Sequence, residues 1–109
     1  MLEIKDKKIK ISWGDTIPLV IKVPGYAFEV GDVAIFAIKE STDPAAVPVF
    51  SKRITSFKGD TLAVNLSPKE TQLPVGTYYW DLSLTAKNGA HYTLNFPSVF
   101  IVTGVAHHD

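Results

Sequence analysis

The amino-acid sequence predicts an all-β domain, a sandwich or barrel of about eight short strands. Three observations support this prediction. Apolar and polar residues alternate at a spacing of two along most of the chain, which is the spacing of side chains on one face of a β-strand. Turn-forming residues separate the alternating runs. No segment shows the apolar spacing of an amphipathic helix.

The expected strands differ in how apolar they are. Val33–Lys39 is apolar on both faces, which is typical of a central strand covered on both sides. Val49–Thr55 contains Lys52 and Arg53, so we expect it at a sheet edge, where charged side chains oppose unwanted strand pairing. The residues expected to face inward on the other strands are Ile9, Ile11 and Trp13; Ile17, Leu19, Ile21 and Val23; Leu62, Val64 and Leu66; Tyr78, Trp80, Leu82 and Leu84; Tyr92, Leu94 and Phe96; and Phe100 and Val102.

Two kinds of turn chemistry lie between these runs. Gly-Asp pairs occur at 14–15, 31–32 and 59–60, where glycine supplies a positive φ and aspartate caps the turn. Ser67, Pro68 and Glu70 form the pattern of a capping box with proline at the first helical position. Because Pro74 forbids extension, we expect one short helical turn near 68–72.

The register of one hairpin follows from its apolar residues. A two-residue turn at 88–89 would place apolar residues opposite polar ones. A slip of one residue reverses every side chain, so we expect a three-residue loop, Lys87–Gly89, with Gly89 in the left-handed conformation. The resulting pairs are Leu84 with Tyr92, Leu82 with Leu94, and Trp80 with Phe96.

Composition excludes several classes of function. The 109 residues contain 11 basic and 11 acidic side chains, and zero net charge argues against nucleic-acid or anionic-membrane binding driven by a basic surplus. The absence of cysteine excludes disulfides and thiol chemistry. The longest apolar run, 33–38, is far shorter than the ~18 residues of a membrane span. We expect a single domain, 1–104, followed by a C-terminal tail, 105–109.

The sequence offers no constellation for catalysis, so we expect a non-enzymatic protein without a cofactor or metal. His91 lies beside a turn, and His107 and His108 lie at the chain end, where ordering is poor. No phosphate loop, dinucleotide fingerprint or nucleophile elbow is present. Turn aspartates Asp15, Asp32 and Asp60 could meet at one end of a sandwich and bind calcium, but the simpler interpretation is that they are turn residues.

Four residues are candidates for an interface or for ligand stacking. Tyr79 and Asp81 lie on the strand face opposite Trp80, and Tyr26 and Phe28 lie outside any clear strand. Three interpretations stay open: Tyr26 and Phe28 cap an open end of the sandwich, the rings anchor a protein interface, or they stack on sugar. Asp81 is expected either to face solvent or to hydrogen-bond at an interface.

The order of turn and core residues resembles small immunoglobulin-like β-sandwich domains of bacteriophages and prophages, especially the N-terminal domain of phage baseplate upper proteins. The resemblance implies an immunoglobulin-like antiparallel sandwich and a structural role in a virion tail or baseplate, without an active site. The segments that support it are Gly14–Thr16, Phe28–Val33, Leu66–Thr71, Leu73–Leu82, Gly89, Thr93-Leu94 and Phe100–Val102.

The expected function is therefore assembly through protein–protein contacts. The expected partners are other virion proteins or copies of the chain itself, in a homo-oligomer, and we expect synthesis in the bacterial cytoplasm and a final location in the virion. The alternative is a carbohydrate-binding or adhesive module that uses Tyr26, Phe28 and Tyr79 as a stacking platform.

Overall fold

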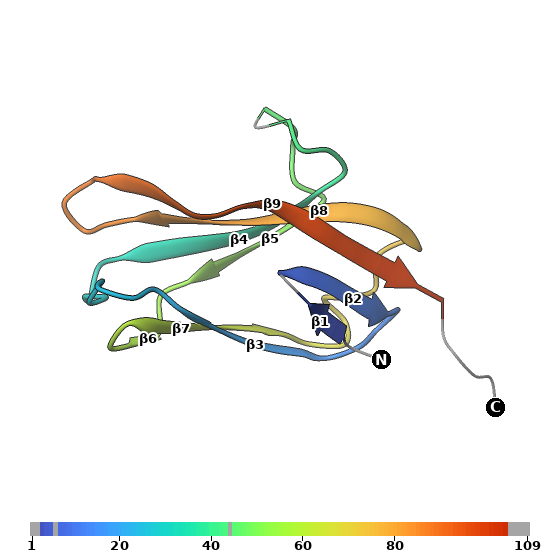
Figure 1. Ribbon diagram of the computed structural model, residues 1–109, viewed down its shortest axis with the longest axis horizontal. Helices are drawn as coiled ribbons and strands as arrows, with labels where there is room; N and C mark the ends of the chain where they lie inside the picture. The colour runs from blue at the N-terminus through green and yellow to red at the C-terminus, as the bar shows by residue number, and fades with distance from the viewer. Residues whose placement is uncertain (1–2, 6, 44, 105–109) are drawn as a thin grey trace.

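The computed structural model describes residues 3–5, 7–43 and 45–104. The expectation of an all-β sandwich is confirmed, because the described residues form nine strands and no helix (Figure 1). The strands are β1 (Glu3–Lys5), β2 (Lys8–Ser12), β3 (Ile17–Lys22), β4 (Val33–Lys39), β5 (Phe50–Ile54), β6 (Phe57–Lys58), β7 (Thr61–Leu66), β8 (Gly76–Thr85) and β9 (His91–Thr103). The expected tail, 105–109, lies outside the described residues.

Two sheets face each other. The larger has six strands in the order β1-β2-β9-β8-β4-β5, and the smaller has three in the order β3-β7-β6. The expectation that all strands are antiparallel is wrong at one pair, because β2 runs parallel to β9, with Ile9 opposite Phe100. These strands come from opposite ends of the chain, so no tight turn forces them to be antiparallel.

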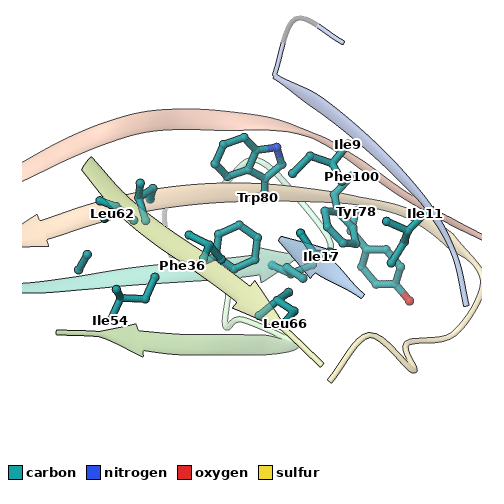
Figure 2. Close-up of a cluster of buried hydrophobic side chains, with 14 of the residues drawn as sticks. Ile9, Ile11, Ile17, Phe36, Ile54, Leu62, Leu66, Tyr78, Trp80 and Phe100 are labelled. Atoms are coloured by element: carbon teal, nitrogen blue, oxygen red, sulfur yellow. The ribbon is translucent and has the colours of Figure 1, made fainter. Parts of the chain in front are cut away.

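The two layers enclose one apolar core (Figure 2). Trp80 of β8 stacks on Phe36 of β4 with 5.6 Å between ring centroids. Most residues expected to face inward are buried, but Trp13 and Tyr92 are 41% and 48% exposed. Trp13 lies in the turn after β2, where the chain leaves the sheet, and alternation no longer determines which way a side chain points.

The tyrosine at the start of β8 fixes the preceding loop. The hydroxyl of Tyr78 donates a hydrogen bond to the carbonyl of Pro74 at 2.5 Å. Because the Tyr78 ring is buried in the core, this bond ties the loop between β7 and β8 to the inside of the sandwich. Burial raises the pKa of the Tyr78 hydroxyl, so it stays protonated and available as a donor at neutral pH.

The prediction that the segment around 49–55 forms an edge strand is confirmed, because β5 ends the larger sheet. Lys52 lies on the core side of β5, opposite Phe36, and its ammonium group reaches across the sandwich. It donates to the Asn65 carbonyl at 2.7 Å and to Glu70 Oε1 at 3.0 Å. An inward-directed charge of this kind protects a sheet edge and here also links the two sheets.

The capping box at 67–70 forms as predicted. The Ser67 N–H donates to Glu70 Oε1 at 2.8 Å, and the Glu70 N–H donates to Ser67 Oγ at 3.3 Å. A bond from the Thr71 N–H to the Ser67 carbonyl closes the single expected turn, and no helix follows it. Thr71 instead turns inward and donates its hydroxyl hydrogen bond to the Asp15 carbonyl.

The hairpin register is confirmed near its loop and wrong beyond it. Leu84 lies opposite Tyr92, and Gly89 has the expected positive φ, 91°. Two irregularities in β9 then shift the pairing, so that Asn95 lies opposite Leu82 and Ser98 lies opposite Trp80. Extra residues in one strand shift the register in this way, and Pro97, which has no N–H, lies in the shifted segment.

The hairpin loop gives the first testable prediction. Gly89→Val should lower the free energy of unfolding by about 1–2 kcal/mol, because a side chain at positive φ clashes with the backbone. Gly89→Asn is the matched control and should cost less, because asparagine tolerates this conformation. Urea unfolding followed by circular dichroism measures both. Unchanged stability of the valine variant would contradict the observed loop conformation.

Candidate functional site

Tyr26 and Phe28 belong to an aromatic cluster at one end of the sandwich. Phe28 stacks on Phe57 with 4.4 Å between centroids, and Tyr26 packs edge-on against Phe28 at 5.0 Å and Tyr92 at 6.4 Å. Tyr26, Phe28 and Phe57 also pack against the main core. This geometry supports the interpretation that the rings cap the open end of the sandwich.

Asp32 holds this end together, a role that its place in a Gly-Asp turn did not reveal. This residue is only 1% exposed. One carboxylate oxygen accepts hydrogen bonds from the Tyr26 hydroxyl at 2.9 Å and the Glu29 N–H at 3.0 Å, and the other accepts from the Lys87 N–H at 2.9 Å. Asp32 therefore links the loop before β4 to the β8–β9 hairpin, 55 residues away in sequence.

These hydrogen bonds change the acidity of Asp32. The Glu29 N–H does most to lower the pKa of the carboxyl group, and the Lys87 N–H and Tyr26 hydroxyl lower it further, while desolvation opposes them. Each donor stabilises the charged form, which is why the pKa falls although the group is buried.

The three turn aspartates do not converge. Asp60 lies at the end where β3 finishes, since the Val23 N–H donates to its carbonyl. Asp32 lies toward the same end, because its partner Glu29 follows Phe28, whose N–H donates to the Gly59 carbonyl. Asp15 precedes β3 at the opposite end, beside Thr71. Across the described ranges, no three His, Asp or Glu side chains come together as a metal site.

Tyr79 and Asp81 lie on the outer face of the six-stranded sheet, away from the core. Lys39 is opposite Tyr79 on β4, and its ammonium group lies 3.3 Å from the Asp81 carboxylate. The two side chains are only 15% and 20% exposed. Asp81 is thus paired within its own sheet and only partly exposed to solvent.

Apolar side chains surround this ion pair. They alternate along their strands with buried core residues, so they must point to the opposite face of the sheet. In register, Val99 lies opposite Tyr79, Ile101 opposite Thr77, and Ile35 opposite Ser83. We define the outer-face patch as Ile35, Ala37, Tyr79, Val99 and Ile101 together with the Lys39–Asp81 pair.

Tyr79 cannot share a stacking platform with Tyr26 and Phe28. β4 starts at Val33, next to Asp32, and ends at Lys39, opposite Tyr79. Its length is about 20 Å at the rise of a β-strand. Tyr26 and Phe28 lie near the start of β4, whereas Tyr79 lies beside the end of β4 and faces outward. Tyr79 therefore lies on a different surface from Tyr26 and Phe28.

A hollow of about 330 Å³ adjoins the ion pair, and it is lined by Lys39, Asp81, Leu82, Ser83, His91, Thr93 and Pro97. It contains the residue types of a hydrolytic triad, so its geometry matters. Asp81 is engaged by Lys39, and His91 Nδ1 lies 3.2 Å from Thr85 Oγ1. A triad needs the histidine to contact both a nucleophile and a carboxylate. His91 contacts the Thr85 hydroxyl, but none of the described hydrogen bonds joins it to a carboxylate.

Sequence reasoning missed most of the outer-face patch. It identified Tyr79 and Asp81 but not Lys39, Val99 or Ile101. The signal was present in Phe100 and Val102, because two inward residues place their neighbours Val99 and Ile101 on the other face. The pairing of Lys39 with Asp81 depends on the register of β4 against β8, which alternation within one strand does not determine.

Comparisons with protein-family models, with curated proteins and with solved structures gave no match. Within the described part of the chain there is also no helix with the length and apolar character needed to cross a membrane.

The acidity of Asp32 leads to a prediction about pH. The folded pKa lies below the unfolded value of 3.8, so this carboxylate contributes stability above that value, and the contribution is lost as pH falls through the folded pKa. Asp32→Asn should be less stable at neutral pH and should lose less stability on acidification than the parent. Urea unfolding between about pH 7 and pH 2 measures the difference.

Asp43→Asn is the matched control for this measurement, because Asp43 lies on an exposed loop and accepts only a local bond from the Ala45 N–H. The control should follow the parent at each pH. If Asp32→Asn also followed the parent, the role of Asp32 in joining the loop to the hairpin would be wrong.

Proposed function

We propose that this chain is a non-enzymatic structural protein of a phage or prophage virion, in the tail or baseplate, that acts through protein–protein contacts. The observation that supports this proposal is the outer-face patch. It combines the partly buried side chains of Ile35, Tyr79, Val99 and Ile101, and the buried Ala37, with a shielded ion pair on a broad sheet face. Contiguous apolar surface of this kind is characteristic of interaction sites.

The arrangement of strands supports an immunoglobulin-like form of the sandwich. In such domains, one sheet contains strands B, E and D and the other contains G, F and C, extended by C′ in variable-type domains. Here β3-β7-β6 and β9-β8-β4-β5 have this order. The bond from the Tyr78 hydroxyl to the Pro74 carbonyl corresponds to the tyrosine corner at the start of strand F.

The chemistry of the patch favours a protein surface as its partner. Lys39 and Asp81 neutralise each other, so covering them does not leave an isolated charge in a dry interface. The apolar side chains on both sides supply the area whose removal from water drives association. A second copy of the chain, or another virion protein with a flat apolar face, satisfies both conditions, and symmetric homo-oligomers are the usual outcome of self-contact.

The place in a virion rests on the resemblance of the turn and core segments to phage immunoglobulin-like domains. The turns that contribute to it form as expected, including the capping box at 67–70 and the positive φ of Gly89. A rigid sandwich synthesised in the bacterial cytoplasm and packed against neighbouring virion proteins is consistent with this role. Zero net charge also suits close packing of many copies.

Self-association tests the proposal. Sedimentation equilibrium of the parent chain over a concentration series should show reversible oligomers. Val99→Lys should weaken association about tenfold or more, because it places an unpaired charge within the patch, opposite Tyr79. Val75→Lys is the matched control, since Val75 is 63% exposed in the loop before β8, and it should associate like the parent.

Circular dichroism would confirm that both variants are folded. A parent chain that stays monomeric at every concentration, and that also fails to co-purify with virion proteins of its host phage, would contradict the proposal. Equal association of Val99→Lys and the parent would place the contact elsewhere on the domain.

A further inference from the structure

The smaller sheet has an unpaired edge at β3. Among the described residues, β3 pairs only with β7. The Val23 N–H donates to the Asp60 carbonyl at 2.7 Å, so by the alternation of antiparallel ladders Ile21 and Leu19 also direct their backbone groups toward β7. The backbone groups of Val20 and Lys22 then point away from the sheet. Pro18 has no N–H to donate, so only the second half of β3 can pair regularly with another strand.

A groove of about 280 Å³ runs beside this edge. One wall is β3, and the other is formed by β9 and the turn between β1 and β2. Trp80, which is 4% exposed, lies at the bottom. The groove is lined by Lys7, Ile9, Leu19, Val20, Ile21, Lys22, Trp80, Leu94 and Asn95. Most of this lining is apolar, so apolar side chains of an added strand would contact the partly buried edge of the core.

The opposite wall cannot accept a strand as readily. β9 pairs with β2 only from Phe100 onward, so the part of β9 before Phe100 also lies beside the groove. That part contains both register irregularities and Pro97, features that interrupt a ladder. The edge of β3 is the regular one, and strand addition there is the simpler geometry.

The outer side of β3 is also apolar. Val20 is 66% exposed and lines a second hollow of about 390 Å³ on the smaller sheet, together with Phe57, Leu62 and Ala63. A strand added beside β3 would direct alternate side chains into the groove and toward this hollow. One row of its side chains would enter the apolar groove, and the other would lie over the outer side of β3, where Lys22 is exposed beside Val20.

The charges at the rim indicate what kind of segment fits. Lys7 and Lys22 both line the groove, and the described lining residues include no carboxylate. Lys22 lies 3.8 Å from Asp60, but its side chain is 67% exposed, and an ion pair in water is weak. Both ammonium groups can thus pair with a carboxylate on an incoming chain.

We propose that the β3 edge and its groove bind an extended segment of a partner protein that alternates apolar and acidic residues. The segment adds to the smaller sheet as a fourth strand, in the way that β-augmentation extends an exposed edge. Backbone groups of Val20 and Lys22 supply the ladder bonds, the groove accepts apolar side chains, and Lys7 and Lys22 select for acidic ones. This contact is separate from the outer-face patch.

Peptide titration tests the proposal on the full chain. The probe is a short peptide that alternates valine with glutamate, and the matched peptide carries lysine in place of glutamate. In two-dimensional NMR, the glutamate peptide should shift the amide signals of Val20 and Lys22 and should bind at least tenfold more tightly than the lysine peptide. Equal affinity, or shifts confined to other strands, would overturn the proposal.

Variants separate the backbone contribution from the charges. Val20→Pro removes one outward N–H and should weaken binding of the glutamate peptide at least tenfold, as should Lys22→Glu. Lys69→Glu, on the exposed turn after β7, is the matched charge reversal and should bind like the parent. Parent-like binding by Val20→Pro and Lys22→Glu would contradict strand addition at this edge.

A second copy of the chain is the other possible occupant, and the same spectra detect it. If the Val20 and Lys22 signals shift with protein concentration in the absence of peptide, the edge binds another copy and the assignment to an acidic partner is wrong. Repeating the titration with Val99→Lys keeps the result independent of self-association through the outer-face patch.

Discussion

The contacts of Trp80 are the interaction on which the rest of the structure depends. Its ring stacks on Phe36 between the layers, and its Nε1 donates to the Lys7 carbonyl at 2.8 Å, across 73 residues of sequence. Lys7, which accepts this bond, has an uncommon positive φ of 69°. One side chain thus joins the core to the β1–β2 turn and lies at the bottom of the groove beside β3.

Much of this arrangement could be predicted from the sequence. The period of two identified the longer strands because their alternate residues face the core, whereas β1 and the two-residue β6 were not predicted. The polar segment at 49–55 indicated a sheet edge. Ser67 with Glu70, and Gly89, identified turns because their conformations depend on short-range chemistry. These features are local, so neighbouring residues determine them.

Features that depend on distant segments could not be predicted in the same way. The parallel pairing of β2 with β9 joins the two ends of the chain, and the bulges in β9 shift the partners of Leu82 and Trp80. Asp32 has a sequence context like those of Asp15 and Asp60, yet it alone receives bonds from the Tyr26 hydroxyl and the Lys87 N–H. Pairing of Asp81 with Lys39 likewise requires the register of two strands.

The result is a closed core with two different outer surfaces, a broad sheet face and an open strand edge. Residue-resolved amide hydrogen exchange tests this account most directly, because it reads backbone pairing strand by strand. Leu19 and Ile21 should exchange slowly and Val20 and Lys22 quickly, while the paired amides of β4 and β8 should be protected most. Equal protection of all four β3 amides, or fast exchange throughout β4 and β8, would contradict it.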